Sequence, residues 1–288
     1  MVRTWTRADA ARALRRPTAD DDKYSRGVLG MRTGSEAYPG AAVLGVEAAW
    51  RTGLGMVRYL GPERPTALVL ARRPETVSAD GRVQAWVIGS GTDASARTPS
   101  DTAALRALLS DTDPVVVDAG ALDLAAEATA PRILTPHDRE HARLRAALGL
   151  GHAPADRIDA ARETAEATGA VVLLKGAVTV VVAPDGWAAT VGAGTPWLAT
   201  AGTGDVLAGV IGALVAGALA QDGHTDAASL AALAASGAWL HGRAGAIAAE
   251  GASIAGASSS PPFGDGPITA LDVAEALPRA VAEVLARA

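Results

Sequence analysis

The sequence predicts a three-layer α/β/α domain, in which a mostly parallel central sheet is covered by helices on both faces. Short apolar runs alternate with longer, alanine-rich helical stretches along the whole chain. The apolar runs are continuous rather than alternating, which is typical of parallel strands buried on both faces. Hydrophobic residues make up 49% of the 288 residues, but aromatic residues only 3%. Alanine, valine and leucine must therefore fill a large core.

The expected strands are short apolar runs bounded by turn-forming residues. They comprise 28–31, 56–60, 67–70, 86–88, 115–118, 132–135, 171–174 and 179–183. The expected helices comprise 41–52, 101–109, 136–148, 155–168, 205–219, 226–249 and 269–286. Thr269 is placed to cap the last helix, with Asp272 in its first turn. The Gly/Ser/Pro-rich segment 251–267 is expected to form a surface loop, and no stretch resembles a linker, so residues 1–288 are predicted to form one domain.

Composition disfavours several classes of partner. The net charge is −5 without a basic block, so nucleic acid is not an expected partner. The chain has no cysteine, which excludes disulfides and thiolate metal sites and fits a cytoplasmic location. The charged N-terminus lacks the apolar region of a signal peptide. The most apolar segment, 206–220, is shorter than the roughly 20 residues of a membrane span, which favours a buried central helix and no membrane partner.

Polar and glycine-rich loops follow several of the expected strands. They comprise 89–93, 118–120, 135–138 and 175–177. Ligands of open parallel sheets bind beyond the carboxyl ends of the strands, so these loops are where a site is expected. We favour a turn role for Asp93 and leave the role of Asp118 open. Lys175 follows a buried strand, where it could neutralise phosphate or simply extend its ammonium into water.

The stretch ATAGTGDVLAGVIGALVAGALA (199–220) carries the strongest chemical signal. Gly202, Thr203 and Gly204 lead into a long apolar helix, whose first amides and dipole suit an anion, most plausibly a phosphate. Asp205 follows in the first turn, where a carboxylate would repel that phosphate unless it accepts the proton of an attacking hydroxyl. Stabilisation of the helix dipole is the alternative. Neither a G-x-x-x-x-G-K-[ST] loop nor an early G-x-G-x-x-G turn is present.

Several segments together resemble one family. They are YPGAAVLGVEAAWRTGLGMVRYL (38–60), VIGSGTD (87–93), VVVDAGALDL (115–124), ILTPHDREHARL (133–144), VVLLKGAVTVVVAPDG (171–186) and VGAGTPWLATAGTGDVLAGVIGALVA (191–216). In order and spacing they are similar to the ADP/ATP-dependent NAD(P)H-hydrate dehydratases of the ribokinase-like superfamily. The similarity spans roughly residues 23–248 and implies a ribokinase-like fold.

The resemblance also implies an activity, the repair of hydrated NADH and NADPH (NADHX and NADPHX). ADP, or ATP, would phosphorylate the hydroxyl of the hydrate, and phosphate would then leave to restore the nicotinamide. Mg²⁺ is expected with the nucleotide. The family is typically homo-oligomeric, often tetrameric, and a separate NAD(P)HX epimerase could work beside this chain. Its relatives often carry a fused epimerase domain, which this sequence lacks.

Position by position, the resemblance implies a set of site residues. The catalytic group comprises Asp205, Gly202, Thr203 and Gly204; the substrate contacts are Ala41, Gly91, His137 and Asp205; the nucleotide contacts are Lys175, Gly176, Ala177, Val178, Thr179 and Gly204. His137 follows Thr135-Pro136, which predicts a helix with proline at its first position and the ring facing the crevice.

Some residues depart from the family pattern or carry other interpretations. The departures are Ser90, Asp138, Arg139, Thr195 and Ala201. His137 and His141 have the spacing of a metal pair, but no third ligand is apparent, so a solvated helix face is favoured and no metal ligand is assigned. A small-molecule kinase of the same superfamily and a non-catalytic nucleotide-binding protein are the alternative functions.

Overall fold

A single sheet of nine strands runs through the part of the chain that the computed structural model describes, residues 2–251 and 266–286. The strand order is β1-β9-β8-β7-β6-β5-β4-β2-β3. The strands are β1 (Arg3–Thr4), β2 (Val28–Arg32), β3 (Met56–Tyr59), β4 (Ala85–Ile88), β5 (Val115–Val117), β6 (Arg132–Leu134), β7 (Val171–Leu174), β8 (Thr179–Val182) and β9 (Ala188–Val191). Neighbouring strands are parallel except at β8, which runs antiparallel to β7 and β9.

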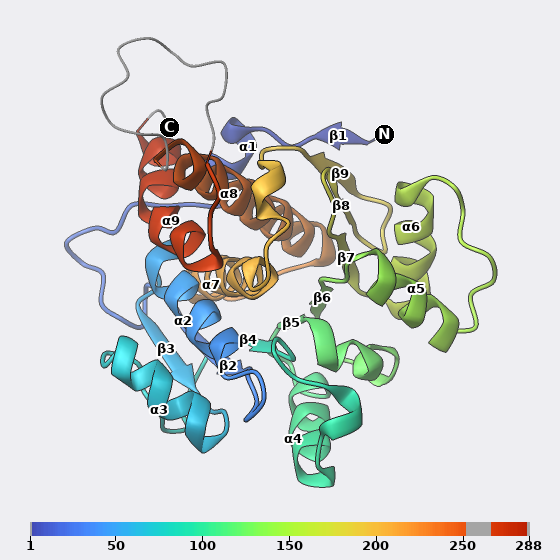
Figure 1. Cartoon of the computed structure of the whole chain (residues 1–288). Helices are drawn as coiled ribbons and strands as arrows, with labels where there is room; N and C mark the ends of the chain where they lie inside the picture. The colour runs from blue at the N-terminus through green and yellow to red at the C-terminus, as the bar shows by residue number, and fades with distance from the viewer. Residues whose placement is uncertain (1, 252–265, 287–288) are drawn as a thin grey trace.

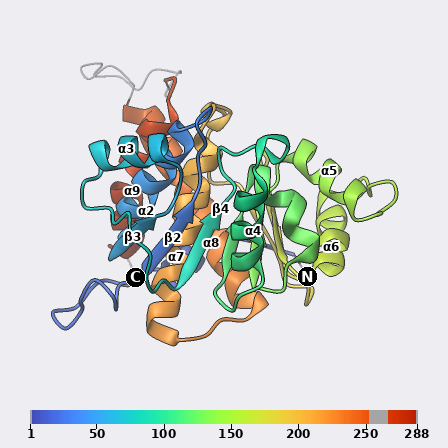
Figure 2. The same cartoon turned by 90° about the horizontal axis from the view of Figure 1, so that it is seen from below.

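Helices cover both faces of this sheet (Figures 1 and 2). They are α1 (Arg7–Ala11), α2 (Gly40–Thr52), α3 (Glu63–Arg72), α4 (Pro99–Leu109), α5 (Asp138–Ala147), α6 (Arg157–Thr168), α7 (Thr203–Asp222), α8 (Ala227–Gly251) and α9 (Ala270–Leu285), with short 3₁₀ helices η1 (Ala94–Ala96), η2 (Ala119–Glu127) and η3 (Pro196–Leu198). Helices α2, α7, α8 and α9 lie on one side, and α4, α5 and α6 on the other (Figure 1). This confirms the predicted three-layer, mostly parallel α/β/α fold.

The sheet separates two hydrophobic cores because successive side chains of a strand point to opposite faces. In β5, Val116 belongs to the core under α7 and α8, whereas Val115 and Val117 belong to the core under α4 and α6. The central strands are therefore apolar at most positions on both faces. This explains the continuous runs in the sequence and confirms their interpretation as strands buried on both faces.

Helix α7 crosses the middle of the molecule and packs on α2, α8 and the strands β2 and β4. Within the described residues it is the one helix long and apolar enough to pass for a membrane span, but 67% of that stretch is buried inside the protein. The predicted buried central helix is confirmed, and it runs from Thr203 to Asp222, longer than expected.

Two local predictions are wrong. The expected strand 67–70 lies inside α3, where Pro65 and Val69, four residues apart, are buried while Leu68 is 43% exposed. A spacing of four residues is that of one helix face, and the apolar run is too short to distinguish a helix from a strand.

The short strands β1 and β9 were not expected, because Arg3–Thr4 and Ala188–Val191 carry weak strand signals. The Thr269 cap is confirmed by its reciprocal hydrogen bonds with Asp272. Most of the expected loop 251–267 lies outside the described residues.

Candidate active site

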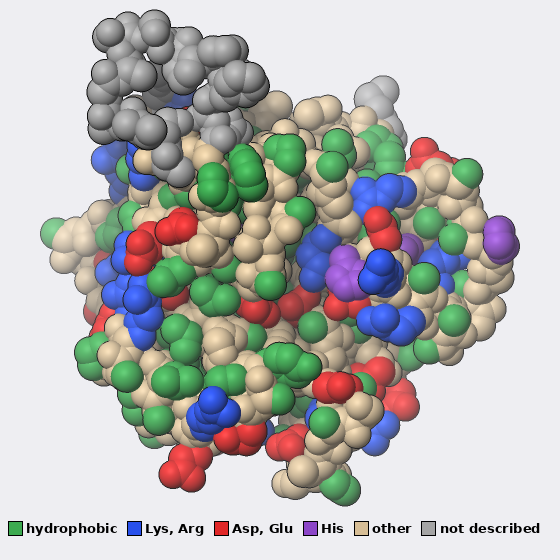
Figure 3. Space-filling model, viewed as in Figure 1, with side chains coloured by type: hydrophobic (Ala, Val, Ile, Leu, Met, Phe, Trp, Pro, Cys, Tyr) green, Lys and Arg blue, Asp and Glu red, His purple; other side chains and the backbone are tan. Residues whose placement is uncertain are grey.

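The carboxyl ends of β4, β5, β6 and β7 meet at one edge of the sheet, because these strands are adjacent and parallel. The four loops singled out in the sequence follow these strands. On this face acidic side chains, a histidine and several Lys or Arg side chains gather across the middle (Figure 3). The first turns of α2 and α7 border the same region, since a Cβ at Gly202 would lie 2.6 Å from Leu44 Cδ1.

Asp118 forms hydrogen bonds with the loops after β4, β6 and β7. It follows β5 and is only 2% exposed. One carboxylate oxygen, Oδ1, accepts hydrogen bonds from Thr135 Oγ1 at 2.8 Å and from Lys175 Nζ at 2.9 Å. The other, Oδ2, accepts one from Ser90 Oγ at 2.9 Å. The structure therefore places this aspartate, whose role the sequence left open, at the centre of the site rather than in a turn on the surface.

Lys175 brings a cation to the same point. Its ammonium also lies 3.7 Å from Glu140 Oε2 in α5. Burial lowers its pKa, but the nearby carboxylates of Asp118, Glu140 and Asp205 outweigh burial, so the pKa lies above the ordinary lysine value. The lysine is thus charged near neutral pH and faces the crevice from the end of β7, as a phosphate ligand requires.

The start of α7 forms the predicted anion cradle. Gly202 caps the helix with φ +90°, a left-handed conformation that glycine tolerates best. No side chain caps the helix, and among the described residues the amides of Gly204 and Asp205 donate to no other group. A Cβ at Gly204 would lie 3.5 Å from Lys175 Nζ. Free amides, the helix dipole and an ammonium thus converge on one spot, which suits a phosphate.

The Asp205 carboxylate lies half-buried beside this cradle and forms no hydrogen bond or ion pair with the described residues. Burial raises the pKa of Asp205 to about 7; the charge of Asp118 acts in the same direction and that of Lys175 opposes it. A free carboxylate that titrates near neutral pH is suited to general-base chemistry. The alternative, a carboxylate that only stabilises the helix dipole, would leave no reason to bury it.

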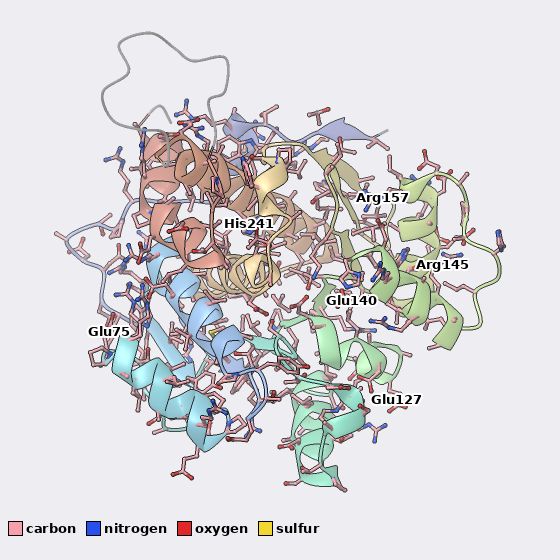
Figure 4. All side chains as sticks on the ribbon, viewed as in Figure 1. Glu75, Glu127, Glu140, Arg145, Arg157 and His241 are labelled. Atoms are coloured by element: carbon pink, nitrogen blue, oxygen red, sulfur yellow. The ribbon has the colours of Figure 1, made fainter. Side chains whose placement is uncertain are left out.

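Thr203 plays a different part from its neighbours. Its hydroxyl donates to the carbonyls of Leu198 and Thr200, both at 2.9 Å, so it fixes the turn that leads into α7. Behind it lies His241 of α8 (Figure 4), which is buried and whose Nε2 has no hydrogen-bond partner within the described part of the chain. Burial lowers the pKa of His241 to about 4, although the nearby Thr203 backbone acts in the opposite direction and raises it. The histidine is therefore neutral beneath the cradle.

Two predicted substrate contacts pack directly on one another. Gly91 has φ +65°, and a Cβ there would lie 2.3 Å from the Cβ of Ala41 and 3.0 Å from the carbonyl oxygen of Tyr38. Only glycine at 91 and a small residue at 41 fit this contact. Ala41 lies one turn before Leu44, which borders Gly202. The structure thus places Gly91 and Ala41 on the α2 side of the crevice.

His137 occupies the opposite side, but the expected position of proline is wrong. The helix begins at Asp138, and His137 itself caps it: Nδ1 accepts from the amides of Arg139 at 3.1 Å and Glu140 at 3.2 Å. Pro136 therefore lies before the cap, because the histidine ring replaces the usual Ser or Thr oxygen. The ring remains half-exposed at the end of the β6 loop.

The predicted nucleotide loop is held in place by a residue that the sequence did not reveal. Arg157 of α6 donates to the carbonyls of Val178 at 2.7 Å and Lys175 at 2.8 Å, and it pairs with Asp138 at 3.0 Å. Gly176 and Ala177 lie in the same turn, Val178 is 49% exposed, and Thr179 begins β8. Figure 4 shows Arg157 and Glu140 on the same side of the site.

The departures from the family pattern have local explanations in part. Ser90 supplies a hydroxyl to Asp118, which a proline could not. Asp138 pairs with Arg157. Thr195 caps η3 by accepting a hydrogen bond from the Trp197 amide at 3.4 Å. Nothing in the structure explains Arg139 or Ala201, both of which are exposed.

The remaining polar candidates take structural roles. His141 is not on a solvated helix face, as expected, but buried, with Nε2 2.8 Å from Thr164 Oγ1, because this face of α5 packs on α6. Burial lowers its pKa to about 4. Within residues 2–251 and 266–286, no group of three His, Cys, Asp or Glu side chains could hold a metal. Asp93 caps η1 through the Ser95 amide, which confirms its turn role.

A separate cavity of about 250 Å³ contains none of the predicted site residues. It lies at the other end of α7, among residues that precede β2 and β3. The convergence of Asp118, Lys175, Asp205 and free amides at the carboxyl edge is the better guide to chemistry, because pocket volume alone carries no reactive group.

The fold and this site together define a ribokinase-like α/β protein with an anion cradle at the carboxyl edge of its sheet. The family model for NAD(P)H-hydrate dehydratase matches residues 29–260. The chain belongs to the NAD(P)H-hydrate dehydratase family.

Individual relatives agree with this assignment. The chain is 45% identical over 227 residues to the bifunctional NAD(P)H-hydrate repair enzyme Nnr of Mycobacterium tuberculosis, covering 70% of this chain and 44% of that one. It therefore spans less than half of that relative. It is 36% identical over 257 residues to the ADP-dependent (S)-NAD(P)H-hydrate dehydratase of Neisseria meningitidis, covering 82% of each.

The solved structure of the ADP/ATP-dependent NAD(P)H-hydrate dehydratase of Bacillus subtilis, co-crystallised with ATP and Mg²⁺, is similar to this fold. Its TM-score is 0.77, its sequence is 28% identical, and the match covers 98% of this chain and 99% of that one.

Proposed function

We propose that this chain is an ADP-dependent NAD(P)H-hydrate dehydratase that returns NADHX and NADPHX to NADH and NADPH. The observation that carries the proposal is the free Asp205 carboxylate beside the α7 amides and Lys175. A base, an anion cradle and a cation converge there, which is the set of groups that phosphoryl transfer to a hydroxyl needs. The names of the family model and of the Neisseria relative support the substrate and the ADP donor.

The first step is phosphoryl transfer. Asp205 accepts the proton of the hydrate hydroxyl, whose oxygen attacks the terminal phosphorus of ADP. The bond between that phosphorus and the bridging oxygen breaks, and AMP leaves with the electron pair. Lys175 and the α7 amides stabilise the negative charge that spreads over the transferred oxygens. Because the amides are fixed by the helix, they need no reorganisation during the reaction.

The second step is elimination. The carbon–oxygen bond of the phosphorylated hydrate breaks, and phosphate leaves with the bonding electrons. Loss of a proton from the neighbouring carbon then forms the double bond of the nicotinamide ring. Phosphorylation is necessary because hydroxide is a poor leaving group and phosphate a good one. The sum is hydrate plus ADP to NADH or NADPH plus AMP and phosphate.

Ala41 and Gly91 form the small-residue wall on which the hydrated dinucleotide would lie, with His137 across the crevice. Lys175 to Thr179 would hold the nucleotide, in the turn that Arg157 fixes. Mg²⁺ fits this site only as an ion carried by the nucleotide phosphates, because Asp118 and Glu140 already face Lys175 and the described residues hold no metal cluster. When bound, Mg²⁺ would neutralise phosphate charge.

We extend the proposal to the setting of the enzyme. The family resemblance supports a homo-oligomer, a tetramer in particular. The absence of cysteine supports a cytoplasmic location. We further propose that the chain forms a single domain. A separate NAD(P)HX epimerase would supply the reactive epimer. The name of the bifunctional Mycobacterium tuberculosis enzyme, 44% of which matches this chain, supports that partnership.

The test is a dehydration assay with NADHX and with NADPHX, each with ADP, with ATP and without nucleotide. The proposal expects recovery of the reduced nicotinamide absorbance with ADP, together with equimolar AMP and phosphate. A stable phosphorylated product would instead identify a small-molecule kinase. Nucleotide binding without turnover would identify a non-catalytic nucleotide-binding protein.

A further inference from the structure

The charge of Lys175 acts on two acids, Asp118 and Asp205. The Lys175 ammonium pairs with Asp118 at 2.9 Å. It also lies close to the residue before Asp205, because a Cβ added at Gly204 would be 3.5 Å from Lys175 Nζ. The charges of Lys175 and Asp205 act on each other. A lysine side chain is long and flexible, so its ammonium can move without a change in the backbone. The structure shows it bound to Asp118, and Asp205 without a partner among the described residues.

The position of Asp118 is fixed from several directions. Ser90 and Thr135 donate to its two oxygens from the loops after β4 and β6. The next residue, Ala119, has φ +44°, a left-handed conformation that costs a non-glycine residue free energy. Such strain is retained only where the surroundings enforce it. Asp118 is therefore a rigid acceptor, whereas the Asp205 carboxylate has no hydrogen-bond partner among the described residues.

We propose that Asp118 is a positioning residue, which holds the Lys175 ammonium off the Asp205 carboxylate so that Asp205 stays free to accept a proton. This inference rests on the proposed function, because it matters only if Asp205 acts as a base. Without Asp118, Lys175 would pair with Asp205 and leave a carboxylate too weakly basic to activate a hydroxyl. The same contact keeps Lys175 directed at the nucleotide phosphates.

The other groups around Asp205 do not supply this effect. Helices α2 and α9 present Leu44, Gly45 and Ala270 to the start of α7, none of which titrates. Glu140 of α5 faces Lys175, and His241 of α8 is neutral near pH 7 because burial lowers its pKa. Asp118 and Lys175 are therefore the charged groups that decide the state of Asp205.

A direct test needs no substrate. The titration of the Asp205 carboxyl carbon is followed by NMR in the ligand-free protein and in Asp118→Asn, with Asp205→Asn to assign the signal. Asparagine keeps the size of the side chain and a hydrogen-bonding oxygen, but not the charge. The pKa of Asp205 should fall by about 1–3 pH units in Asp118→Asn. An unchanged titration in a folded variant would overturn the proposal.

A double-mutant cycle separates positioning from simple repulsion between the two acids. The substitution Lys175→Met should raise the pKa of Asp205 more in the Asp118→Asn background than in the wild-type background, because only there does the lysine reach Asp205. Equal shifts in both backgrounds would contradict the proposal. If Asp118→Asn does not fold, the Ser90→Ala/Thr135→Val variant, which loosens Asp118, should shift the titration in the same direction, and no shift would count against it.

The turnover number provides a second test of the role of Asp118. In the dehydration assay, Asp118→Asn should lower kcat roughly ten- to a hundredfold, a range typical of residues that orient a reacting group. Asp123→Asn, which loses the Arg97 pair on the exposed side of η2, is the matched control and should keep wild-type activity. A wild-type protein without dehydratase activity would refute the proposed function while the NMR titration still decides the role of Asp118.

Discussion

The Lys175 ammonium lies 2.9 Å from a carboxylate oxygen of Asp118, while Asp205, on whose pKa the same ammonium acts, has no partner among the described residues. One acid is thus bound and the other is left free, although both lie within the field of the same cation. This asymmetry leaves the pKa of Asp205 raised, because burial is not offset by a direct ion pair. The proposed role of Asp205 as a base depends on it.

The proposed base predicts a pH dependence. Asp205 must be ionised to accept a proton, and its pKa is raised to about 7. The value of kcat/KM should therefore fall about tenfold per pH unit below about pH 7 and level off above it. Steady-state kinetics with saturating ADP measures this. A limb near the ordinary aspartate value of 3.8 would show that another group is the base.

The same carboxylate should cost stability. Because its folded-state pKa lies above its unfolded value, the folded protein binds more protons between about pH 4 and pH 7, and stability falls as pH rises through that range. Asp205→Asn removes this effect. Above pH 7 the variant should unfold at a higher denaturant concentration than the wild type, with a free energy of unfolding larger by roughly 1–4 kcal/mol. It should also lose turnover. A variant that is no more stable than the wild type at high pH would contradict the burial argument.

Much of the fold could be predicted because most strands are buried on both faces and so read as unbroken apolar runs. The prediction failed where that signal is ambiguous. The run at 67–70 is short enough to suit either a strand or one side of α3. The edge strand β1 has only two residues, both polar, and its neighbour β9 is half alanine, so neither stands out in the sequence. Packing against the rest of the molecule, not local sequence, decides these cases.

The site was predictable where chemistry and backbone coincide in one short segment, as at Gly202–Asp205. It was not predictable where the partners are distant in sequence. Arg157 holds the Lys175 loop from α6, and Glu140 reaches Lys175 from α5, yet both look like ordinary surface charges of a helix. Asp118 offered one signal, an acid directly after a fully apolar strand, and the roles of the predicted contacts themselves stay predictions.

Arg157 should control nucleotide binding without taking part in chemistry. Replacing it with alanine removes the hydrogen bonds to the Lys175 and Val178 carbonyls, so the loop loses its anchor. The KM for ADP should rise roughly tenfold while kcat changes little, since a lost charged hydrogen bond costs about 1.5–3 kcal/mol. Calorimetry of ADP binding and steady-state kinetics measure the two effects.

Arg162→Ala is the control for that substitution. Arg162 lies in the same helix and, among the residues that the structure describes, pairs only with Asp159 on the exposed surface; such pairs contribute little. Its KM for ADP should match the wild type. If both arginine variants raise KM equally, general charge near the site, and not the anchoring of the loop, explains the effect.

Gly202 provides the sharpest test of the anion cradle. A Cβ at this position would lie 2.6 Å from Leu44 Cδ1 and 3.0 Å from the Cβ of Ala270, and the backbone has φ +90°. Gly202→Ala must therefore shift the first turn of α7 or both neighbours. We expect a loss of stability of about 1–3 kcal/mol and a loss of kcat of about a hundredfold, because amides aimed at a transferring phosphoryl group tolerate little displacement.

Gly223→Ala separates these two effects. Gly223 ends the same helix with φ +72°, but no atom lies within 4 Å of where its Cβ would be. This variant has the backbone strain without the collision and lies far from the amides of the first turn. It should lose about 1 kcal/mol of stability and keep its kcat. If Gly202→Ala and Gly223→Ala lowered kcat alike, the first turn of α7 would not be the place where the phosphoryl group is held.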